Sequence, residues 1–309
     1  MNEIILAIIQ PIFLLLLAPL VSGTTRVLRA KMHTRQGPSI LQDYYDIAKL
    51  FKRQDIHTEN SGFVFRIMPV VFLASVLLLA MGIPMVTRFC PIPLLGDIIT
   101  IIYLLVLPRF FFALSSIDSS GSYPGVGGIR ELLLGVLVEP SMLLALFVAA
   151  LAAGSTNIGV IGDSVALFAT TSPVAVVIAA VAFAAAGYIE LGKLPYDLAE
   201  AEQEIQEGPL AEYSGPSLAL LKLAMPIKQI LIVSLFLSIF FPFGSAVDMA
   251  LPSLAIGLVL YWIKISVVFL VCAVIENSVM RVRFKLLSRQ TWMVVGLAVL
   301  SFAFFVIGV

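Results

Sequence analysis

The chain has 309 residues, of which 60% are hydrophobic and only 12% are charged, and its mean hydropathy is +1.06. Soluble domains are about 45–50% apolar and about 25% charged, so this composition excludes an ordinary soluble fold. The formal net charge is zero, which gives no reason to expect nucleic acid or another strongly charged partner.

Apolar segments long enough to cross a hydrocarbon core of about 30 Å recur along the whole chain. We therefore predict an all-α polytopic protein, with residues 1–309 forming one integral membrane domain. The N-terminus lacks the basic residues and cleavage site of a signal peptide, so we expect the first span to be retained. The predicted spans are, approximately, 4–21, 67–86, 98–117, 131–153, 173–191, 229–243, 254–275 and 291–307.

Lysine and arginine are concentrated in alternate connections between these spans. The first, third, fifth and seventh connections hold 16 of them, whereas the others hold only Arg88. The positive-inside rule therefore places the two long connections, about 22–66 and 192–228, in the cytoplasm and both termini outside. We expect a multi-pass protein of the inner (cytoplasmic) membrane. The sixth span is short and could begin near Leu218, with Pro226 as a kink.

The first cytoplasmic connection is basic and contains an Arg-Gln-Gly-Pro turn followed by aromatic residues. Its cations could bind anionic lipid, with each contact worth about 1 kcal/mol. They could equally form a docking surface for a partner subunit, and the two interpretations are compatible. The residues concerned are Arg26, Arg29, Arg35, Gly37, Pro38, Tyr44, Tyr45 and Phe51.

No motif of this chain is typical of a metal centre or a nucleotide site. Cys90 and Cys272 are far apart, and the two histidines share one polar loop without ligand spacing. The glycine-rich segment 121–130 follows a span rather than a strand and lacks a Gly-Lys-Ser/Thr ending, so we interpret it as a flexible turn before a helix. We expect no metal or cofactor on this chain and no catalysis by it alone.

Several ionisable residues lie in or beside the predicted spans. Arg109 is in the third span, Glu131 and Glu139 are in the fourth, Lys264 is in the seventh, and Glu276 ends the seventh. Such residues are costly in a membrane, so they could pair across the bundle or line a hydrated path. For Glu276 we favour snorkelling to the interface. Glu139 and Lys264 are too deep for that, so we favour a functional role for both.

The most acidic segment is 190–215, which holds seven carboxylates in 26 residues. If 197–207 is a helix, four of them repeat at the helical period and share one face. Mutual repulsion would raise their pKa values, so they could relay protons; the alternative is a solvated acidic helix. Glu190 and Lys193, at the end of the fifth span, are spaced for a same-face ion pair. The seven acids are Glu190, Asp197, Glu200, Glu202, Glu204, Glu207 and Glu212.

The segment from Glu190 to Gly215 resembles, without a gap, the signature of the subunit-1 (H-type) membrane subunit of respiratory complex I. That signature is a glutamate, an arginine, Pro-Phe-Asp-Leu-Pro-Glu-Ala-Glu, and then Glu-Tyr-Ser-Gly. Arg130 and Glu139 match an arginine–glutamate pair of the family's fourth span, and Arg35-Gln-Gly-Pro38 matches an Arg-x-Gly-Pro element of its first loop.

The departures from that signature resemble the hydrogenase branch of the same family. Lys193 replaces the arginine, Ala199 replaces a proline, and the first loop lacks an Asn-Arg-Val-Gly-Pro insertion. These features are similar to the membrane subunit of formate hydrogenlyase and hydrogenase 4, which are energy-converting NiFe hydrogenases. The resemblance implies that quinone binding, a property of complex I, is dispensed with.

The resemblance further implies an anchor that seats the iron–sulfur small subunit and the NiFe large subunit beside antiporter-like membrane subunits. Iron–sulfur clusters and the NiFe centre would belong to those partners. Two rivals are a quinone-site subunit of a complex I-like NADH dehydrogenase and a stand-alone secondary transporter. The implied proton- or sodium-coupling residues are Glu139, Glu190, Asp197, Glu200, Glu202, Glu204 and Glu212, with Lys193 as counter-charge and Arg35 and Arg130 structuring the loops. Glu207 and Lys264 complete the candidate coupling set from the residue analysis above.

Overall fold

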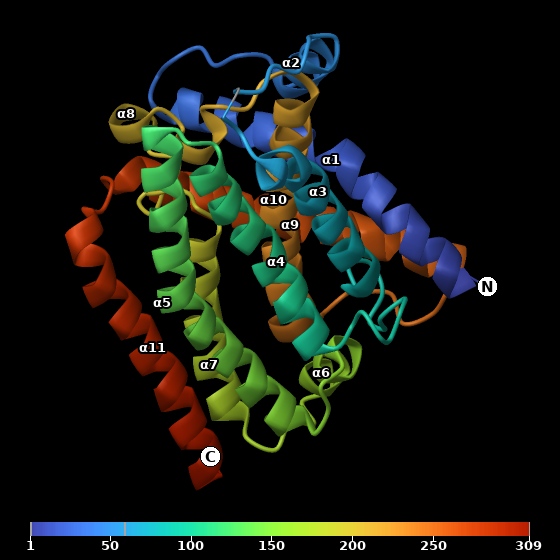
Figure 1. Ribbon diagram of the computed structural model, residues 1–309. Coiled ribbons are helices and arrows are strands. Elements are labelled where there is room, and N and C mark those ends of the chain that lie inside the picture. Colours follow the sequence, from blue (N-terminus) through green and yellow to red (C-terminus); the bar gives the residue numbers. More distant parts are fainter. Residues whose placement is uncertain (1, 59, 309) are drawn as a thin grey trace.

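Helices form the regular secondary structure of the computed structural model, which describes residues 2–58 and 60–308 but not the side chains of Asn2, Glu202 and Lys285 (Figure 1). Within the described residues, eight helices are long and apolar enough to cross a membrane. The predicted all-α polytopic fold is therefore confirmed. These helices are α1 (Asn2–Met32), α3 (Phe63–Gly82), α4 (Ile98–Asp118), α5 (Ser122–Ala153), α7 (Pro173–Glu190), α9 (Gly215–Phe240), α10 (Leu251–Ser278) and α11 (Phe284–Ile307).

Short elements occupy the connections at both ends of the bundle. The first and fifth connections carry α2 (Gln42–Phe51), α8 (Glu202–Ile205) and the 3-10 turn η1 (Gly208–Leu210). Figure 1 shows α2 and α8 at the same end of the molecule, with α6 (Ile158–Ala166) at the other. The two long polar connections thus share one face of the bundle.

Two predicted boundaries differ from the structure. Residues 122–130, which we predicted to be a flexible turn, form the first turns of α5. This part of α5 packs against α4 and η1, and such tertiary packing outweighs the low helix propensity of its glycines. The sixth span does begin early, because α9 starts at Gly215 and contains Pro226.

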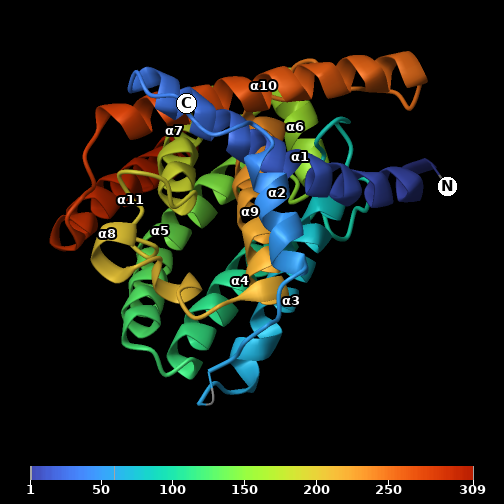
Figure 2. The ribbon, with the colours of Figure 1, turned by 90° about the horizontal axis from the view of Figure 1, so that it is seen from above.

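Helix α9 is central in the bundle, whereas α10 and α11 are peripheral. In the most apolar window of each helix, 61% of α9 is buried, against 28% of α10 and 22% of α11. Helix α10 lies along α1 at one edge of the bundle, and α11 packs on α5 and α7 (Figure 2). This arrangement surrounds the ends of α4, α5, α7 and α9 that lie nearest α2 and α8 with other helices, and the charged site lies there.

Candidate functional site

A single arginine joins three transmembrane helices through three carboxylates. Arg109 on α4 is buried, and its Nη1 lies 2.6 Å from Glu139 Oε1 on α5. Its Nε lies 3.0 Å from Glu131 Oε1, also on α5, and its Nη2 is hydrogen-bonded to Glu190 at the end of α7. The prediction that ionisable groups of different spans pair across the bundle is confirmed for Arg109.

Lys228 on α9 completes this cluster. Its Nζ lies 2.9 Å from Glu190 Oε1 and 4.0 Å from Glu131 Oε1. Three carboxylates and two cations carry a formal charge of −1 when all are ionised. We call Arg109, Glu131, Glu139, Glu190 and Lys228 the charge cluster. An excess charge among poorly solvated groups is costly, so the cluster is sensitive to any further charge placed near it.

Gly135 on α5 makes room for the guanidinium of Arg109. A Cβ atom at this position would lie 2.8 Å from both Cδ and Nη1 of Arg109 and 3.2 Å from Oε1 of Glu139. Side-chain atoms do not tolerate contacts that short, so any larger residue would displace Arg109 from the carboxylates.

Two adjacent cavities that share lining residues lie between the polar end of the bundle and the charge cluster. An outer cavity of about 740 Å³ is lined by both acids and bases, among them Arg29, Lys193 and Glu276. An inner cavity of about 60 Å³ reaches Arg109 and Glu190, and is large enough for a few water molecules. Asp197 and Glu200 line both cavities, so they stand where the two meet.

Glu200, in the fifth connection, has a raised pKa. The pKa of Glu200 is raised to about 8, first by burial and then by the nearby carboxylates of Asp197, Glu131 and Glu207, against the opposing effect of Lys228. A group that titrates near neutral pH can exchange protons with water at little cost. Glu200 is therefore suited to pass protons between the outer cavity and the charge cluster.

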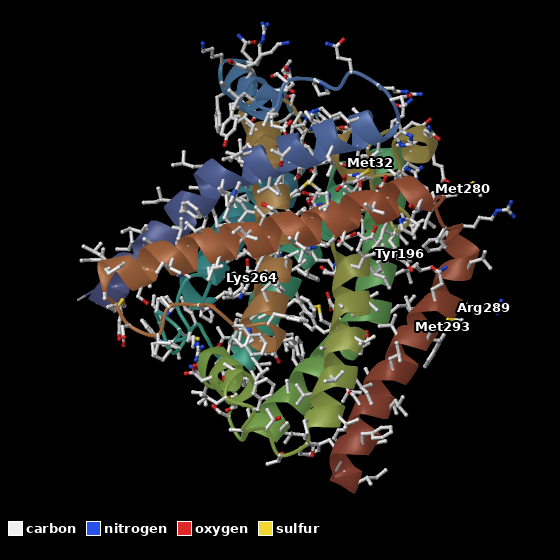
Figure 3. The ribbon with its side chains drawn as sticks, turned by 180° about the vertical axis from the view of Figure 1, so that it is seen from behind. Met32, Tyr196, Lys264, Met280, Arg289 and Met293 are labelled. Carbon is white, nitrogen blue, oxygen red and sulfur yellow. The ribbon has the colours of Figure 1, made fainter. Side chains whose placement is uncertain are left out.

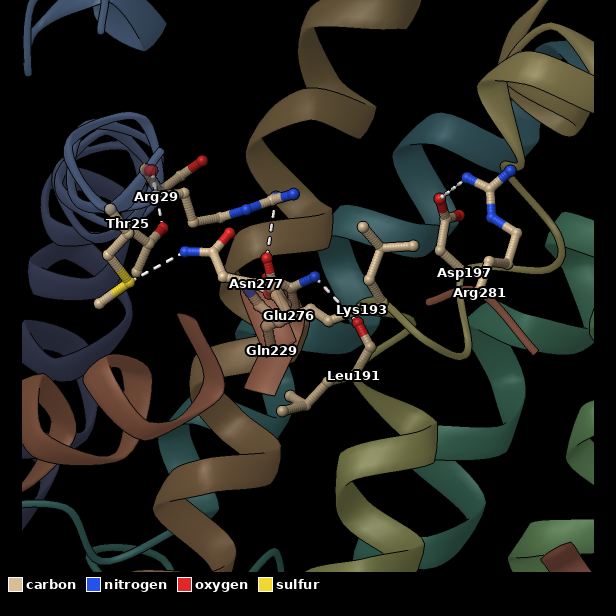
Figure 4. A network of polar contacts seen from close by, with 12 residues as sticks. Thr25, Arg29, Leu191, Lys193, Asp197, Gln229, Glu276, Asn277 and Arg281 are labelled. Carbon is tan, nitrogen blue, oxygen red and sulfur yellow. Dashed lines mark hydrogen bonds and ion pairs between the residues drawn. The ribbon is translucent and has the colours of Figure 1, made fainter. Parts of the chain in front are cut away.

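A second ionic network links the fifth connection, between α7 and α9, to α1 and α10 (Figure 4). Glu276 is 4% exposed, and its Oε2 lies 2.8 Å from Arg29 Nη1 while its Oε1 lies 3.1 Å from Lys193 Nζ. Our preference for snorkelling of Glu276 was therefore wrong, because α1 and the 191–201 connection cover it. The expected Glu190–Lys193 pair was also wrong: Lys193 pairs with Glu276, and Glu190 pairs with Arg109 and Lys228.

The predicted acidic helix over 197–207 was wrong. Only Glu202–Ile205 is helical, and Gln206 and Glu207 adopt left-handed backbone angles, so the four acids share no face. Ion pairs with other parts of the chain hold the fifth connection instead: Asp197 pairs with Arg281 of the α10–α11 connection at 2.8 Å, and Glu204 pairs with Arg130 on α5 at 2.8 Å. Glu207 is exposed, and the side chain of Glu202 lies outside the described part of the structure.

The Glu-Tyr-Ser-Gly motif at 212–215 fastens the fifth connection to the first. Tyr213 donates a hydrogen bond to the Phe65 carbonyl at 2.9 Å, and the two rings stack 4.1 Å apart. Ser214 exchanges hydrogen bonds with both backbone groups of Ile56. Glu212 accepts a hydrogen bond from Thr58 at 3.2 Å. This predicted coupling acid therefore lies where the two connections meet, outside the charge cluster.

The basic first connection divides into paired and exposed residues. Arg26 pairs with Asp43 at 2.7 Å, and Arg29 pairs with Glu276. Arg35 is exposed, and the Gly37-Pro38 turn packs closely on α1 through Ala30. Among the predicted aromatic contacts, the Tyr44 hydroxyl donates to the Leu16 carbonyl within this chain, whereas Tyr45 and Phe51 stay exposed.

Lys264 lies apart from these networks. Its Nζ donates a hydrogen bond to the Phe241 carbonyl at 2.8 Å, and among the described side chains it has no ion pair with an acid. Of the two roles considered for this residue, pairing across the bundle is therefore not seen, and a place on a hydrated path stays a prediction. Sequence reasoning also missed Lys228, which was assigned to a loop although the early start of α9 places it inside a span.

Comparison with known proteins places the whole chain in one family. The family model described as NADH dehydrogenase matches residues 4–307. The chain is 47% identical to hydrogenase-4 component C of Escherichia coli (strain K12), covering 99% of this chain and 96% of that protein. It is 45% identical to formate hydrogenlyase subunit 4 of the same organism, covering 97% and 98%.

More distant relatives and one solved structure agree with this placement. NADH-quinone oxidoreductase subunit 8 of Rhodothermus marinus is 27% identical, covering 71% of this chain and 67% of that protein. A chain in the structure of the membrane-bound sulfane sulfur reductase, an archaeal respiratory membrane complex, superposes with a TM-score of 0.85 at 21% identity, covering 97% and 98%, and so shares the fold. The resemblance to the hydrogenase branch is confirmed. The chain belongs to the NADH dehydrogenase family of multi-pass membrane subunits.

Proposed function

We propose that this protein is the membrane-anchoring and ion-coupling subunit of a NiFe hydrogenase complex of the formate hydrogenlyase type. Its cytoplasmic face would seat the redox subunits, and its charge cluster would link their redox state to movement of protons or sodium ions. The proposal rests on the family, on relatives named as components of hydrogenase-4 and formate hydrogenlyase, and on the charge cluster.

The observation that carries the coupling role is the continuous series of ionisable groups from the outer cavity to the flank of the bundle. Asp197 and Glu200 lie between the cavities, and Glu190 lies deeper, bound to Arg109. A change in charge at the outer cavity can alter the pKa of Glu200, since this carboxyl interacts electrostatically with both Asp197 and Glu131.

Glu139 is the last acid of this series and lies on the flank of the bundle. Its side chain is 26% exposed on the flank formed by α4 and α5, where Ile102 and Val106 surround it. A partly exposed carboxylate at this depth is costly against lipid. We therefore propose that an antiporter-like membrane subunit covers this flank with a polar or ionisable side chain.

The remaining assignments follow from the same proposal. The end that carries α2 and α8 would face the cytoplasm, both termini would lie outside, and the membrane would be the inner cell membrane. The iron–sulfur small subunit and the NiFe large subunit would dock on the exposed residues Arg35, Tyr45 and Phe51. The clusters and the NiFe centre would reside in those subunits, with no cofactor on this chain.

A second candidate function keeps the family but adds a quinone. The outer cavity of about 740 Å³, beside Lys193 and Glu276, is large enough for a small ring compound, and more distant relatives are named NADH-quinone oxidoreductase subunits. The sequence departures at Lys193 and in the first loop favour the hydrogenase assignment.

Purification of the complete complex through a tag on this chain tests the assignment. We expect nickel in the preparation, a co-purifying large hydrogenase subunit and hydrogen evolution with a low-potential donor. Bound quinone and inhibitor-sensitive quinone reduction in a nickel-free preparation would favour the second candidate instead. Ion transport by this chain alone in liposomes would overturn both.

A further inference from the structure

An apolar groove opens between α10 and α11, and the last turns of α7 separate it from the charge cluster. It has a volume of about 500 Å³, and its floor is formed by α7 and α9. Small residues of α7, including Ala184, Ala185 and Gly187, create the space, and none of the lining residues is charged. Because these residues belong to membrane-spanning helices, the groove faces hydrocarbon.

The groove lies in the cytoplasmic half of the membrane and is roofed at that end. The lining residues of α7 and α10 come from the last turns of both helices, before Glu190 and Ser278. The α10–α11 connection crosses above them, held by Val282 N–H to Pro195 O at 3.0 Å and by the Arg281–Asp197 pair. In Figure 3, Tyr196 lies between the two helices below this connection.

We propose that this groove is a binding site for an anionic phospholipid of the cytoplasmic leaflet, with one acyl chain in the groove. A transmembrane helix of a partner is about 10 Å across and would have to pass the roof to reach the cytoplasm. An acyl chain is thinner, and the glycerol end of its lipid can leave the groove sideways, past the edge of the roof. The hydroxyl of Tyr188 already donates to the Leu194 carbonyl at 2.6 Å, so the groove presents its apolar ring.

The charge beside the roof favours an anionic headgroup. The segment 281–289 contains four cations and no acid. Arg281 forms an ion pair with Asp197. Arg283 and Arg289 are exposed, and neither pairs with an acid among the described side chains. Each cation at the cytoplasmic end of a membrane helix increases the affinity for an anionic headgroup about fivefold.

The bound chain would brace the wall of the functional site. Ile189, Leu191 and Tyr196 line both this groove and the inner cavity that reaches the charge cluster. An occupied groove would hold these three residues against the cavity, and an empty groove would leave them packed on one side only. The choice of leaflet rests on the orientation given under the proposed function, whereas the test is separate from the coupling role because it measures lipid alone.

The test measures lipid retained by the purified complete complex. The complex is delipidated, incubated with phosphatidylglycerol or phosphatidylcholine of identical chains, and analysed by native mass spectrometry. We expect phosphatidylglycerol to bind selectively, and the double variant Arg283→Gln/Arg289→Gln to lose roughly 25-fold in affinity. Lys222→Gln, which removes an exposed cation from α9, is the matched control and should bind as the wild type does.

A second pair of variants tests the groove itself. Ala184→Phe fills it from α7 and should abolish retention, whereas Val177→Phe adds the same ring to an exposed position of α7 outside the groove and should not. Equal binding of the two lipids, or retention of phosphatidylglycerol by Ala184→Phe, would overturn the proposal. A partner helix seated in the groove of the assembled complex would overturn it as well.

Discussion

The guanidinium of Arg109 on α4 lies 2.6 Å from the carboxylate of Glu139 on α5, inside the membrane-spanning bundle. The same guanidinium also binds Glu131 and Glu190, so one cation organises three acids from two further helices. Arg109 thereby holds the helices together and neutralises part of the charge of the acids on which ion coupling is proposed to depend.

Replacement of Arg109 by glutamine should destabilise the complex. It leaves the buried Glu190 and the partly buried Glu131 and Glu139 with Lys228 as the remaining cation, and loss of one partner from a buried ion pair costs about 3–5 kcal/mol. Thermal unfolding of the purified complex measures the effect. Arg88→Gln is the control, because its half-exposed pair with Asp163 at 3.9 Å is worth under about 1 kcal/mol. An unchanged melting temperature for Arg109→Gln would contradict the structural role.

The raised pKa of Glu200 predicts a pH-dependent stability that Glu200→Gln removes. A carboxyl group whose pKa rises to about 8 on folding binds more protons folded than unfolded, so its contribution is full below its unfolded value of 4.5 and is lost as pH rises through 8. The melting temperature of the wild type should therefore fall more between pH 6 and 9 than that of the variant. Parallel pH profiles would show that Glu200 is ionised throughout.

Glu276→Gln should loosen α1 from α10. The variant removes the carboxylate shared by Arg29 and Lys193, at a cost of about 1–3 kcal/mol because Arg29 is partly solvated. Hydrogen exchange should increase over residues 22–35, and Asp248→Asn, at an exposed loop position, serves as the control. Unchanged exchange over 22–35 would show that apolar packing alone holds α1.

Gly215→Ala should release the first connection from the fifth. Gly215 has a φ of +49°, and a Cβ there would lie 2.5 Å from the Gln54 carbonyl oxygen, so both backbone strain and a clash oppose the change. Limited proteolysis should become faster near residues 54–58. Gly154→Ala is the matched control, because Gly154 has a φ of +70° but no atom near its added Cβ. Equal cleavage of the two variants would attribute the effect to strain alone.

The membrane spans could be predicted from sequence because their signal is local: each is a long apolar run, and Arg109 and Glu139 stand out within such runs. The ion-pair partners of the charged residues could not be predicted in this way. Asp197 and Glu204 look like one helical stripe, yet Arg281 and Arg130, from distant parts of the chain, draw them apart. Glu276 resembles an interfacial residue until α1 is seen to cover it. Ion pairs with residues distant in the sequence determine where these side chains lie, and local periodicity carries no information about such pairs.

Lys228 shows how one misplaced boundary hides a functional residue. The hydropathy signal of the sixth span weakens near Pro226, so the predicted helix began one residue after Lys228. In the structure α9 continues through Pro226, which brings Lys228 to Glu190. The earlier start at Leu218, which we also considered, would have placed this lysine beside the acids.

Ion movement per hydrogen evolved, measured with the complete complex in sealed liposomes, tests the coupling role most directly. Glu139→Gln and Glu190→Gln each remove a charge at nearly constant volume, whereas Asp163→Asn does so at a half-exposed site outside the charge cluster. We predict that both glutamine variants assemble and evolve hydrogen but move far fewer ions, and that Asp163→Asn behaves as the wild type. Full ion movement by both glutamine variants would contradict the account.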